Sequence, residues 1–271
     1  MLSRQIVAMV AAVILLVWTA RSYGQAAASE SPKPAASSAS ELSPVEKQPA
    51  IARQIAEHTN RFRAGEELPE LRASDELGRA ARYFAEFMAS RGKYGHSADD
   101  QQPWERAAEY GYEACIVAEN IGLQMSTERL ADDALATGFV DRWKDSKEHR
   151  ANLLDPDLME IGVAVAKSQA SGRFYAVQLF GRPKSASIRV EIENRAGLLV
   201  KYKVGEETLE LEDRVVRTHE LCRSAEFTFL LPAADGEERM SVQRVVRQTR
   251  LVVQHDDARE LTVVRSTAVA R

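Results

Sequence analysis

The chain has 271 residues, of which 45% are hydrophobic and 28% charged, and its formal net charge is −4 at pH 7. This composition is typical of a globular protein and excludes both wholesale disorder and a membrane protein with several spans. No basic face stands out, so we expect no nucleic-acid partner. Two cysteines are too few for a disulfide-rich scaffold or a four-cysteine zinc site.

Residues 1–25 predict a secretory signal peptide. An arginine precedes the almost wholly apolar run Ile6–Ala20, and small residues follow at 22–26. The alternative is an uncleaved N-terminal anchor, although fifteen apolar residues rise only about 22 Å as a helix, less than the ~30 Å hydrocarbon core. In either case we expect the rest of the chain to be secreted or in the cell envelope, with membrane contact only through this segment.

Residues 26–50 predict a disordered linker. Ala, Ser and Pro dominate the segment, and Leu42 and Val45 are its only larger aliphatic residues. Such a sequence buries too little apolar surface to offset the entropy lost on ordering.

Residues 51–183 predict a domain in which helices precede strands. Apolar residues recur with helical spacing in the first part, and Ser74 is a favourable N-cap for the second helix. The expected elements are helices from Ile51, after Ser74, from Pro103 and over about Glu128–Lys144, and a hairpin of strands Glu160–Ala166 and Arg173–Phe180. The fold class is therefore α+β, with the domain ending near Pro183.

Residues 184–271 predict a small all-β module. Short runs alternate hydrophobic and polar residues, with turn signals such as Asp235-Gly236 between them. The expected strands contain Ile188–Ile192, Val200–Val204, Thr208–Glu212, Phe227–Leu231, Val242–Val246, Arg250–Gln254 and Leu261–Arg265. Strands of this length and spacing favour a sandwich or a barrel.

Three short motifs in residues 51–183 contain the candidate functional residues. They are Gly95-His96-Ser97, Glu119-Asn120-Ile121 and the segment Ser146–Leu154, which includes His149. Each motif is a weak signal alone. In this order, after Asn60-Arg-Phe-Arg63 in the first helix, they are specific.

With these motifs, residues 51–183 resemble the CAP superfamily (cysteine-rich secretory, antigen 5 and pathogenesis-related proteins), in particular the SCP-like domains of its bacterial branch. Further matching segments are Leu71–Met88, Trp143-x-x-Ser146, Asn152-Leu-Leu, Ile161-Gly162-Val163 and Tyr175–Gly181. The resemblance implies an α-β-α sandwich containing a small antiparallel sheet. It also implies a cleft lined by two histidines and two glutamates that can hold a divalent cation.

Carried over position by position, His96 and His149 match the two histidines, and Glu119 matches the glutamate of the Glu-Asn motif. Ser146 stands where eukaryotic members tend to have the second glutamate, so the sequence departs from the pattern there. Two imidazoles and one carboxylate with an open position are still a sensible set for zinc or another divalent cation. The resemblance thus makes His96, Glu119 and His149 possible metal ligands.

The same residues also have a structural interpretation. His96 and His149 could join loops across the cleft by hydrogen bonds without any metal. Ser146 is expected to cap the following helical turn rather than act as a nucleophile, and no catalytic residue is assigned. The residues expected to be structural are Asn60, Arg63, Asn120, Trp143 and Asn152.

Cys115 and Cys222 lie 107 positions apart, one in each predicted domain. Outside the cytoplasm a disulfide between them is permitted. A free buried cysteine is equally ordinary in the apolar run that contains Cys115. Both alternatives stay open at this point.

Two functions are compatible with the sequence. The first is an extracytoplasmic binding or interaction module, whose cleft takes a divalent metal or a small ligand and whose β module contacts an unknown surface partner. The second is a metal-dependent hydrolase in which zinc on His96, His149 and Glu119 activates water. A second carboxylate acting as general base would favour the enzyme. Because Ser146 stands at that position, binding is the preferred interpretation.

Overall fold

The computed structural model describes residues 48–125, 132–233 and 236–266, which all belong to one compact unit. The predicted signal peptide and most of the predicted linker lie outside the described residues. The linker prediction was wrong at its end, because residues 48–50 form the first turn of a helix. No helix in the described ranges is long and apolar enough to cross a bilayer.

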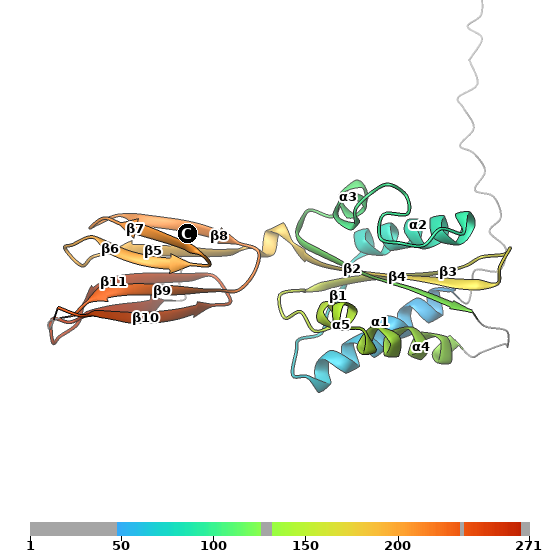
Figure 1. Ribbon diagram of the computed structural model, residues 1–271, viewed down its shortest axis with the longest axis horizontal. Coiled ribbons are helices and arrows are strands. Elements are labelled where there is room, and N and C mark those ends of the chain that lie inside the picture. Colours follow the sequence, from blue (N-terminus) through green and yellow to red (C-terminus); the bar gives the residue numbers. More distant parts are fainter. Residues whose placement is uncertain (1–47, 126–131, 234–235, 267–271) are drawn as a thin grey trace, which may run out of the picture. The chain divides into compact units, whose positions relative to one another are not determined.

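Residues 48–183 form an α-β-α sandwich, which confirms the expected fold (Figure 1). The sheet has the order β1-β3-β4-β2; its pairs are antiparallel except for β1 with β3. Helices α1, α4 and α5 cover one face, and α2 and α3 cover the other. The elements are α1 (Gln48–Gly65), β1 (Arg72–Ala73), α2 (Asp75–Arg91), α3 (Pro103–Glu109), β2 (Ala114–Met125), α4 (Asp132–Asp145), α5 (Lys147–Leu153), β3 (Glu160–Lys167) and β4 (Arg173–Pro183).

The central strand β4 supplies both hydrophobic cores of the sandwich. Side chains of a strand point alternately to its two faces. Tyr175, Val177 and Leu179 accordingly pack beneath α2, whereas Ala176 and Phe180 pack against the layer of α1 and α4. Because both faces are covered, the strand is apolar at nearly every position rather than at every second one.

Helix α2 begins where the sequence predicts. The Ser74 hydroxyl accepts a hydrogen bond from the Leu77 N–H at 3.3 Å, and Gly92 ends the helix in the left-handed region at φ 65°. The start of α2 lies directly against β3. A Cβ at Gly162 would lie 2.2 Å from the Leu77 carbonyl carbon, so only glycine permits this approach.

Residues 188–266 form a sandwich of two four-stranded sheets rather than a barrel. The sheet orders are β10-β9-β6-β7 and β12-β11-β5-β8, and side chains from both sheets share one hydrophobic core. Strand β8, which contains His219, was missed in the sequence. The strands are β5 (Ile188–Asn194), β6 (Val200–Val204), β7 (Glu207–Leu211), β8 (Val216–Leu221), β9 (Ala225–Pro232), β10 (Glu238–Val245), β11 (Thr249–His255) and β12 (Leu261–Ser266).

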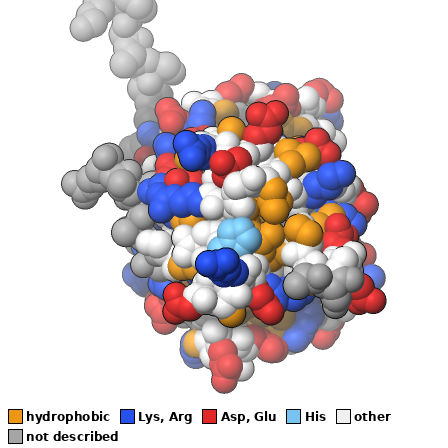
Figure 2. All heavy atoms as spheres, turned by 90° about the vertical axis from the view of Figure 1, so that its left-hand side faces the viewer, with side chains coloured by type: hydrophobic (Ala, Val, Ile, Leu, Met, Phe, Trp, Pro, Cys, Tyr) orange, Lys and Arg blue, Asp and Glu red, His pale blue; other side chains and the backbone are white. Residues whose placement is uncertain are grey.

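The β module also exposes large hydrophobic side chains on its surface. Figure 2 shows one face of the molecule, on which apolar side chains lie between charged ones and beside a histidine. The most exposed large hydrophobic residues of the module are Met240, Val246, Val242, Val216, Leu199 and Val264.

A short 3₁₀ turn, Lys184–Ala186, leads from β4 to β5. Cys115 of β2 and Cys222 are joined by a disulfide, with their Cα atoms 5.2 Å apart, so the bridge is the alternative that the structure adopts. Polar contacts lie beside it. The Arg223 guanidinium is 2.6 Å from the Asp155 carboxylate, and the Ser224 N–H donates to Asp157 Oδ1 at 3.0 Å.

Candidate functional site

Two side chains of α1 fix segments that lie near the predicted site residues. Asn60 donates to the Leu71 carbonyl at 3.0 Å and accepts from the Leu71 N–H at 2.9 Å. Arg63 is fully buried, and its Nη1 donates to the carbonyls of Leu153 and Asp155 at 2.8 and 3.0 Å. Both side chains thus join separate segments of the backbone, and Arg63 fixes the end of α5.

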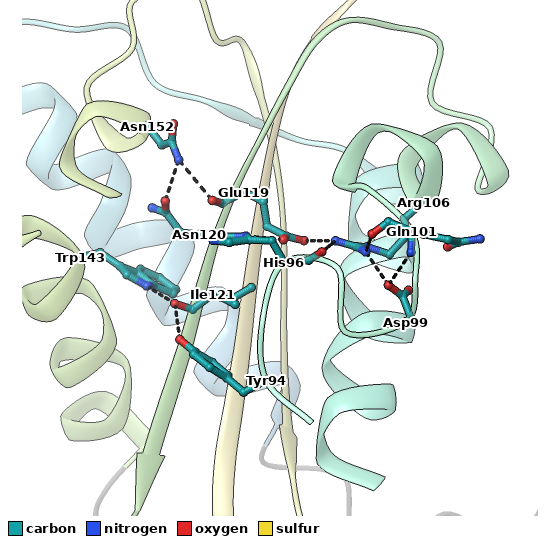
Figure 3. Close-up of polar contacts among 10 residues, drawn as sticks. All are labelled: Tyr94, His96, Asp99, Gln101, Arg106, Glu119, Asn120, Ile121, Trp143 and Asn152. Atoms are coloured by element: carbon teal, nitrogen blue, oxygen red, sulfur yellow. Dashed lines mark hydrogen bonds and ion pairs between the residues drawn. The ribbon is translucent and has the colours of Figure 1, made fainter. Parts of the chain in front are cut away.

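Two asparagines connect the strand of Glu119 to the helix of His149. Asn152 Nδ2 donates to the Glu119 carbonyl at 3.2 Å and to Asn120 Oδ1 at 2.9 Å (Figure 3). Asn120 Nδ2 in turn donates to the His149 carbonyl at 3.3 Å. Because Asn120 is fully buried, its amide must find partners inside the protein, and these bonds fix β2 against α5.

Trp143 and Tyr94 both bind the carbonyl oxygen of Ile121. The buried indole N–H donates to it at 2.9 Å and the tyrosine hydroxyl at 3.2 Å (Figure 3). Burial, followed by the nearby charge of Glu119, raises the pKa of Tyr94 above its usual value, so its hydroxyl stays a donor. Trp143 belongs to the core as expected. Tyr94 was not identified in the sequence.

At the centre of the site, Glu119 lies between a histidine and an arginine. Its Oε1 is 2.8 Å from His96 Nδ1, and its Oε2 is 2.8 Å from Arg106 Nη2 (Figure 3). The side chain of Glu119 is only 1% exposed, whereas that of His96 is 49% exposed. Both carboxylate oxygens are thus engaged within the protein, while the imidazole stands at the surface.

Arg106, on α3, is a further residue of the site that sequence reasoning missed. It is fully buried, and its guanidinium contacts Asp99 at 2.8 Å as well as Glu119. It also donates to the His96 carbonyl at 2.8 Å and lies 3.6 Å from the centre of the Phe84 ring. In the sequence, an arginine next to two alanines in a seven-residue helix does not indicate whether its side chain is buried or exposed to solvent.

His149 lies near this group without joining it. Its ring makes no hydrogen bond with another residue of the described ranges. Burial and then the charge of His96 lower the pKa of His149 below its usual value, and Glu148 opposes this. Of the three predicted cleft residues, the structure brings His96 and Glu119 into direct contact and places His149 within electrostatic range of His96.

Ser146 occupies the N-cap position of α5, with extended backbone angles of φ −93° and ψ 127°. The expectation that its hydroxyl caps the helix was wrong, because that side chain accepts no hydrogen bond from the first turn. The hydroxyl instead lies 3.4 Å from Glu148 Oε2. The helix begins through the backbone, where the Arg150 N–H donates to the Ser146 carbonyl at 2.8 Å.

As placed, the three predicted ligands do not fit a zinc ion. Glu119 Oε1 faces His96 Nδ1, and Oε2 faces a permanently charged guanidinium, whose positive charge would repel a cation at this carboxylate. Within the part of the chain that the structure describes, no group of three or more His, Cys, Asp and Glu residues is arranged to hold a metal ion. The metal assignment to His96, Glu119 and His149 stays a prediction.

The chain is similar to bacterial proteins over about half of its length. It is 25% identical over 134 residues to the uncharacterized protein YkwD of Bacillus subtilis; the match covers 49% of this chain and 48% of that protein, about half of its length. An outer surface protein of Borrelia burgdorferi matches with 19% identity and a TM-score of 0.44, covering 49% of this chain and 93% of that one. An extracellular SCP-domain protein of Bacillus anthracis matches with 23% identity and a TM-score of 0.44, covering 52% of this chain and 44% of that one.

The model of the cysteine-rich secretory protein (CAP) family matches residues 56–180. The same residues contain the ordered motifs from Asn60 to Asn152 and fold into the three layers described above. Residues 56–180 therefore form a domain of the cysteine-rich secretory protein (CAP) family.

Proposed function

We propose that this chain is an extracytoplasmic CAP-domain protein whose cleft at His96, Glu119 and His149 binds a small polar ligand without hydrolysing it. The predicted signal peptide and a disulfide between Cys115 and Cys222 support a location outside the cytoplasm. The exposed hydrophobic side chains of the β module support a role of that module in contact with a surface partner.

The engagement of both Glu119 oxygens is the observation that carries the proposal. A general base needs a carboxylate oxygen within reach of the water that it activates. A cation bound at this carboxylate would also lie close to the positive guanidinium of Arg106. Since Arg106 and His96 occupy both oxygens, Glu119 serves to neutralise the arginine and orient the imidazole, and binding is favoured over hydrolysis.

The two imidazoles determine which ligands suit the cleft. A carboxylate only accepts hydrogen bonds, so His96 Nδ1 must carry the proton that it donates to Glu119. This leaves Nε2 as the His96 ring nitrogen available to a ligand. The lowered pKa of His149 favours the neutral form of that ring at pH 7. Hydroxyl and amide groups both donate and accept hydrogen bonds, so these ring nitrogens suit a polar ligand such as a hydroxyl-rich or amide-bearing small molecule.

The test is a ligand screen on the full chain, read by the ring signals of histidines labelled with ¹⁵N. The probes are a monosaccharide set and a set of small primary amides. We expect at least one set to shift the signals of His96 and His149 and to leave those of His219 and His255 in the β module unchanged.

Substitution identifies the site. His149→Ala should abolish the response, and His255→Ala is the matched control that should keep it. If no probe moves the signals of His96 and His149, or if His219 and His255 respond equally, the proposal fails. Release of product from a matching glycoside or amide would instead support the hydrolase.

A further inference from the structure

Strand β3 has an open edge beyond its first residues. The sheet order places β3 between β4 and the two-residue strand β1, which pairs only with Glu160 and Ile161. After Ala73 the chain leaves the sheet to start α2. From Gly162 onward, no strand in the described ranges pairs with the outer side of β3.

The register shows which backbone groups this leaves free. Along an antiparallel strand, one residue directs its N–H and C=O groups toward the partner strand, and the next residue directs both groups away from it. Ser168 donates its N–H to the Arg173 carbonyl, so the even-numbered residues of β3 face β4. The carbonyl of Ile161 accepts from the Ser74 N–H on the other side. Val163 and Val165 therefore point their N–H and C=O groups outward from the open edge.

A groove of about 320 Å³ lies along this edge, between α1 and α2. Small side chains from both helices line it, including Ala52 and Ala56 of α1 and Gly78 of α2. The floor of small and β-branched residues leaves room for a chain to approach the strand. The lining residues are Pro49, Ala52, Arg53, Ala56, Ala73, Ser74, Gly78, Arg82, Glu86 and Ile161–Val165.

Two arginines give the groove a chemical preference. Arg53 from α1 and Arg82 from α2 both line it, both are exposed, and neither makes a hydrogen bond or ion pair with another described residue. One carboxylate, Glu86, also lines the groove, so its cations outnumber its anions. Guanidinium groups form bidentate bonds with carboxylates. The charge of the groove therefore complements an acidic occupant.

We propose that this groove binds an extended acidic peptide segment of a partner protein, which adds to the sheet as a strand beside β3. The peptide backbone pairs with Val163 and Val165, and its Asp or Glu side chains bind Arg53 and Arg82. Strand addition obtains affinity from main-chain bonds and specificity from alternate side chains. The site lies on β3, whereas the cleft is built on β2 at the opposite edge of the sheet, so this proposal does not depend on the proposed function.

The test begins with a phage-displayed library of random heptapeptides, selected on the immobilised full chain. We expect the selected peptides to carry Asp or Glu at alternating positions. A selected peptide is then synthesised, and its dissociation constant is measured by fluorescence polarisation. A version with methylated amide nitrogens at alternate residues cannot pair with the edge and should bind at least about tenfold more weakly.

A pair of double variants separates the groove from general charge. Arg53→Glu with Arg82→Glu should raise the dissociation constant at least about tenfold. Arg61→Glu with Arg91→Glu makes the same change of net charge on exposed residues of the same helices outside the groove. This control should stay within about twofold of the unmodified chain.

Backbone amide shifts identify the edge that binds. On addition of the peptide, the largest shifts should fall on Val163 and Val165. Equal weakening by both double variants, or shifts centred on another strand, would overturn the proposal. A dimer in sedimentation that Arg53→Glu with Arg82→Glu dissociates would also overturn it, by making a second copy the occupant.

Discussion

Replacing Arg106 by methionine tests how strongly the buried ion pairs hold the cleft together. The substitution keeps an unbranched stem over the Phe84 ring but removes the charge that Asp99 and Glu119 share. Both carboxylate side chains are 1% exposed, and the His96 carbonyl also loses a donor. Removing one partner of a buried ion pair costs about 3–5 kcal/mol, because the other charge stays buried without compensation. We expect a loss in that range.

Urea denaturation followed by tryptophan fluorescence measures this loss. With a slope of about 2 kcal/mol per molar urea, the midpoint should fall by about 2 M. Arg72→Met is the matched control. Arg72 forms its ion pair with Glu160 at the surface, where its side chain is 68% exposed, so its loss should cost only about 0–1 kcal/mol. If Arg106→Met and the control give the same small change, the buried pairs do not stabilise the cleft as argued.

Three further predictions follow from single contacts. Burial is the chief cause that lowers the pKa of His149, so the unfolded chain binds more protons than the folded chain as the pH falls through ~6.5, and the free energy of unfolding should fall with the pH. His149→Gln should flatten this dependence between about pH 7.5 and 5.5, and an unchanged slope would refute the assignment. Ser74→Ala should lower the free energy of unfolding, measured by thermal denaturation, by about 0.5–2 kcal/mol, because the Ser74 hydroxyl caps α2. Ser146→Ala should lower it by less than about 0.5 kcal/mol, because the Ser146 hydroxyl caps no helix. Equal losses would contradict the assigned caps. Proteolysis at Lys184–Ser187 should leave two fragments that separate only after reduction, since the disulfide joins them; separation without reductant would count against the bridge.

The parts of the fold that the sequence predicted well are those in which local signals agree. Helix α2 combines an N-cap, acidic residues in its first turn, a continuous apolar face and a terminal glycine. Strand β8, Val216–Leu221, lacks such agreement. Its buried side is only partly covered and its residues are mostly charged or polar, so hydrophobic alternation is too weak to mark it. It is a strand because β5 pairs with it along six residues.

The candidate site was predictable only where family motifs mark it. The Glu-Asn motif and the two histidine motifs led to Glu119, His96 and His149 through resemblance, not through periodicity. Asp99, Arg106 and Tyr94 carry no motif. Their roles arise from contacts between a loop, a short helix and a strand, which no local pattern specifies. Long-range pairing of this kind is visible only in the folded chain.

The chemistry of the cleft depends on the residue that faces Glu119 more than on Glu119 itself. A histidine and a glutamate in contact are compatible with metal binding when the second carboxylate oxygen is free, and with ligand binding by hydrogen bonds when it is not. In this chain Arg106 supplies a charge that is 2.8 Å from that oxygen and fully buried. Displacing the guanidinium to admit a cation would break its ion pair with Glu119. The bound cation would also repel the guanidinium. The ion pair therefore favours a fixed imidazole platform, although the order of the family's motifs is the same for either chemistry.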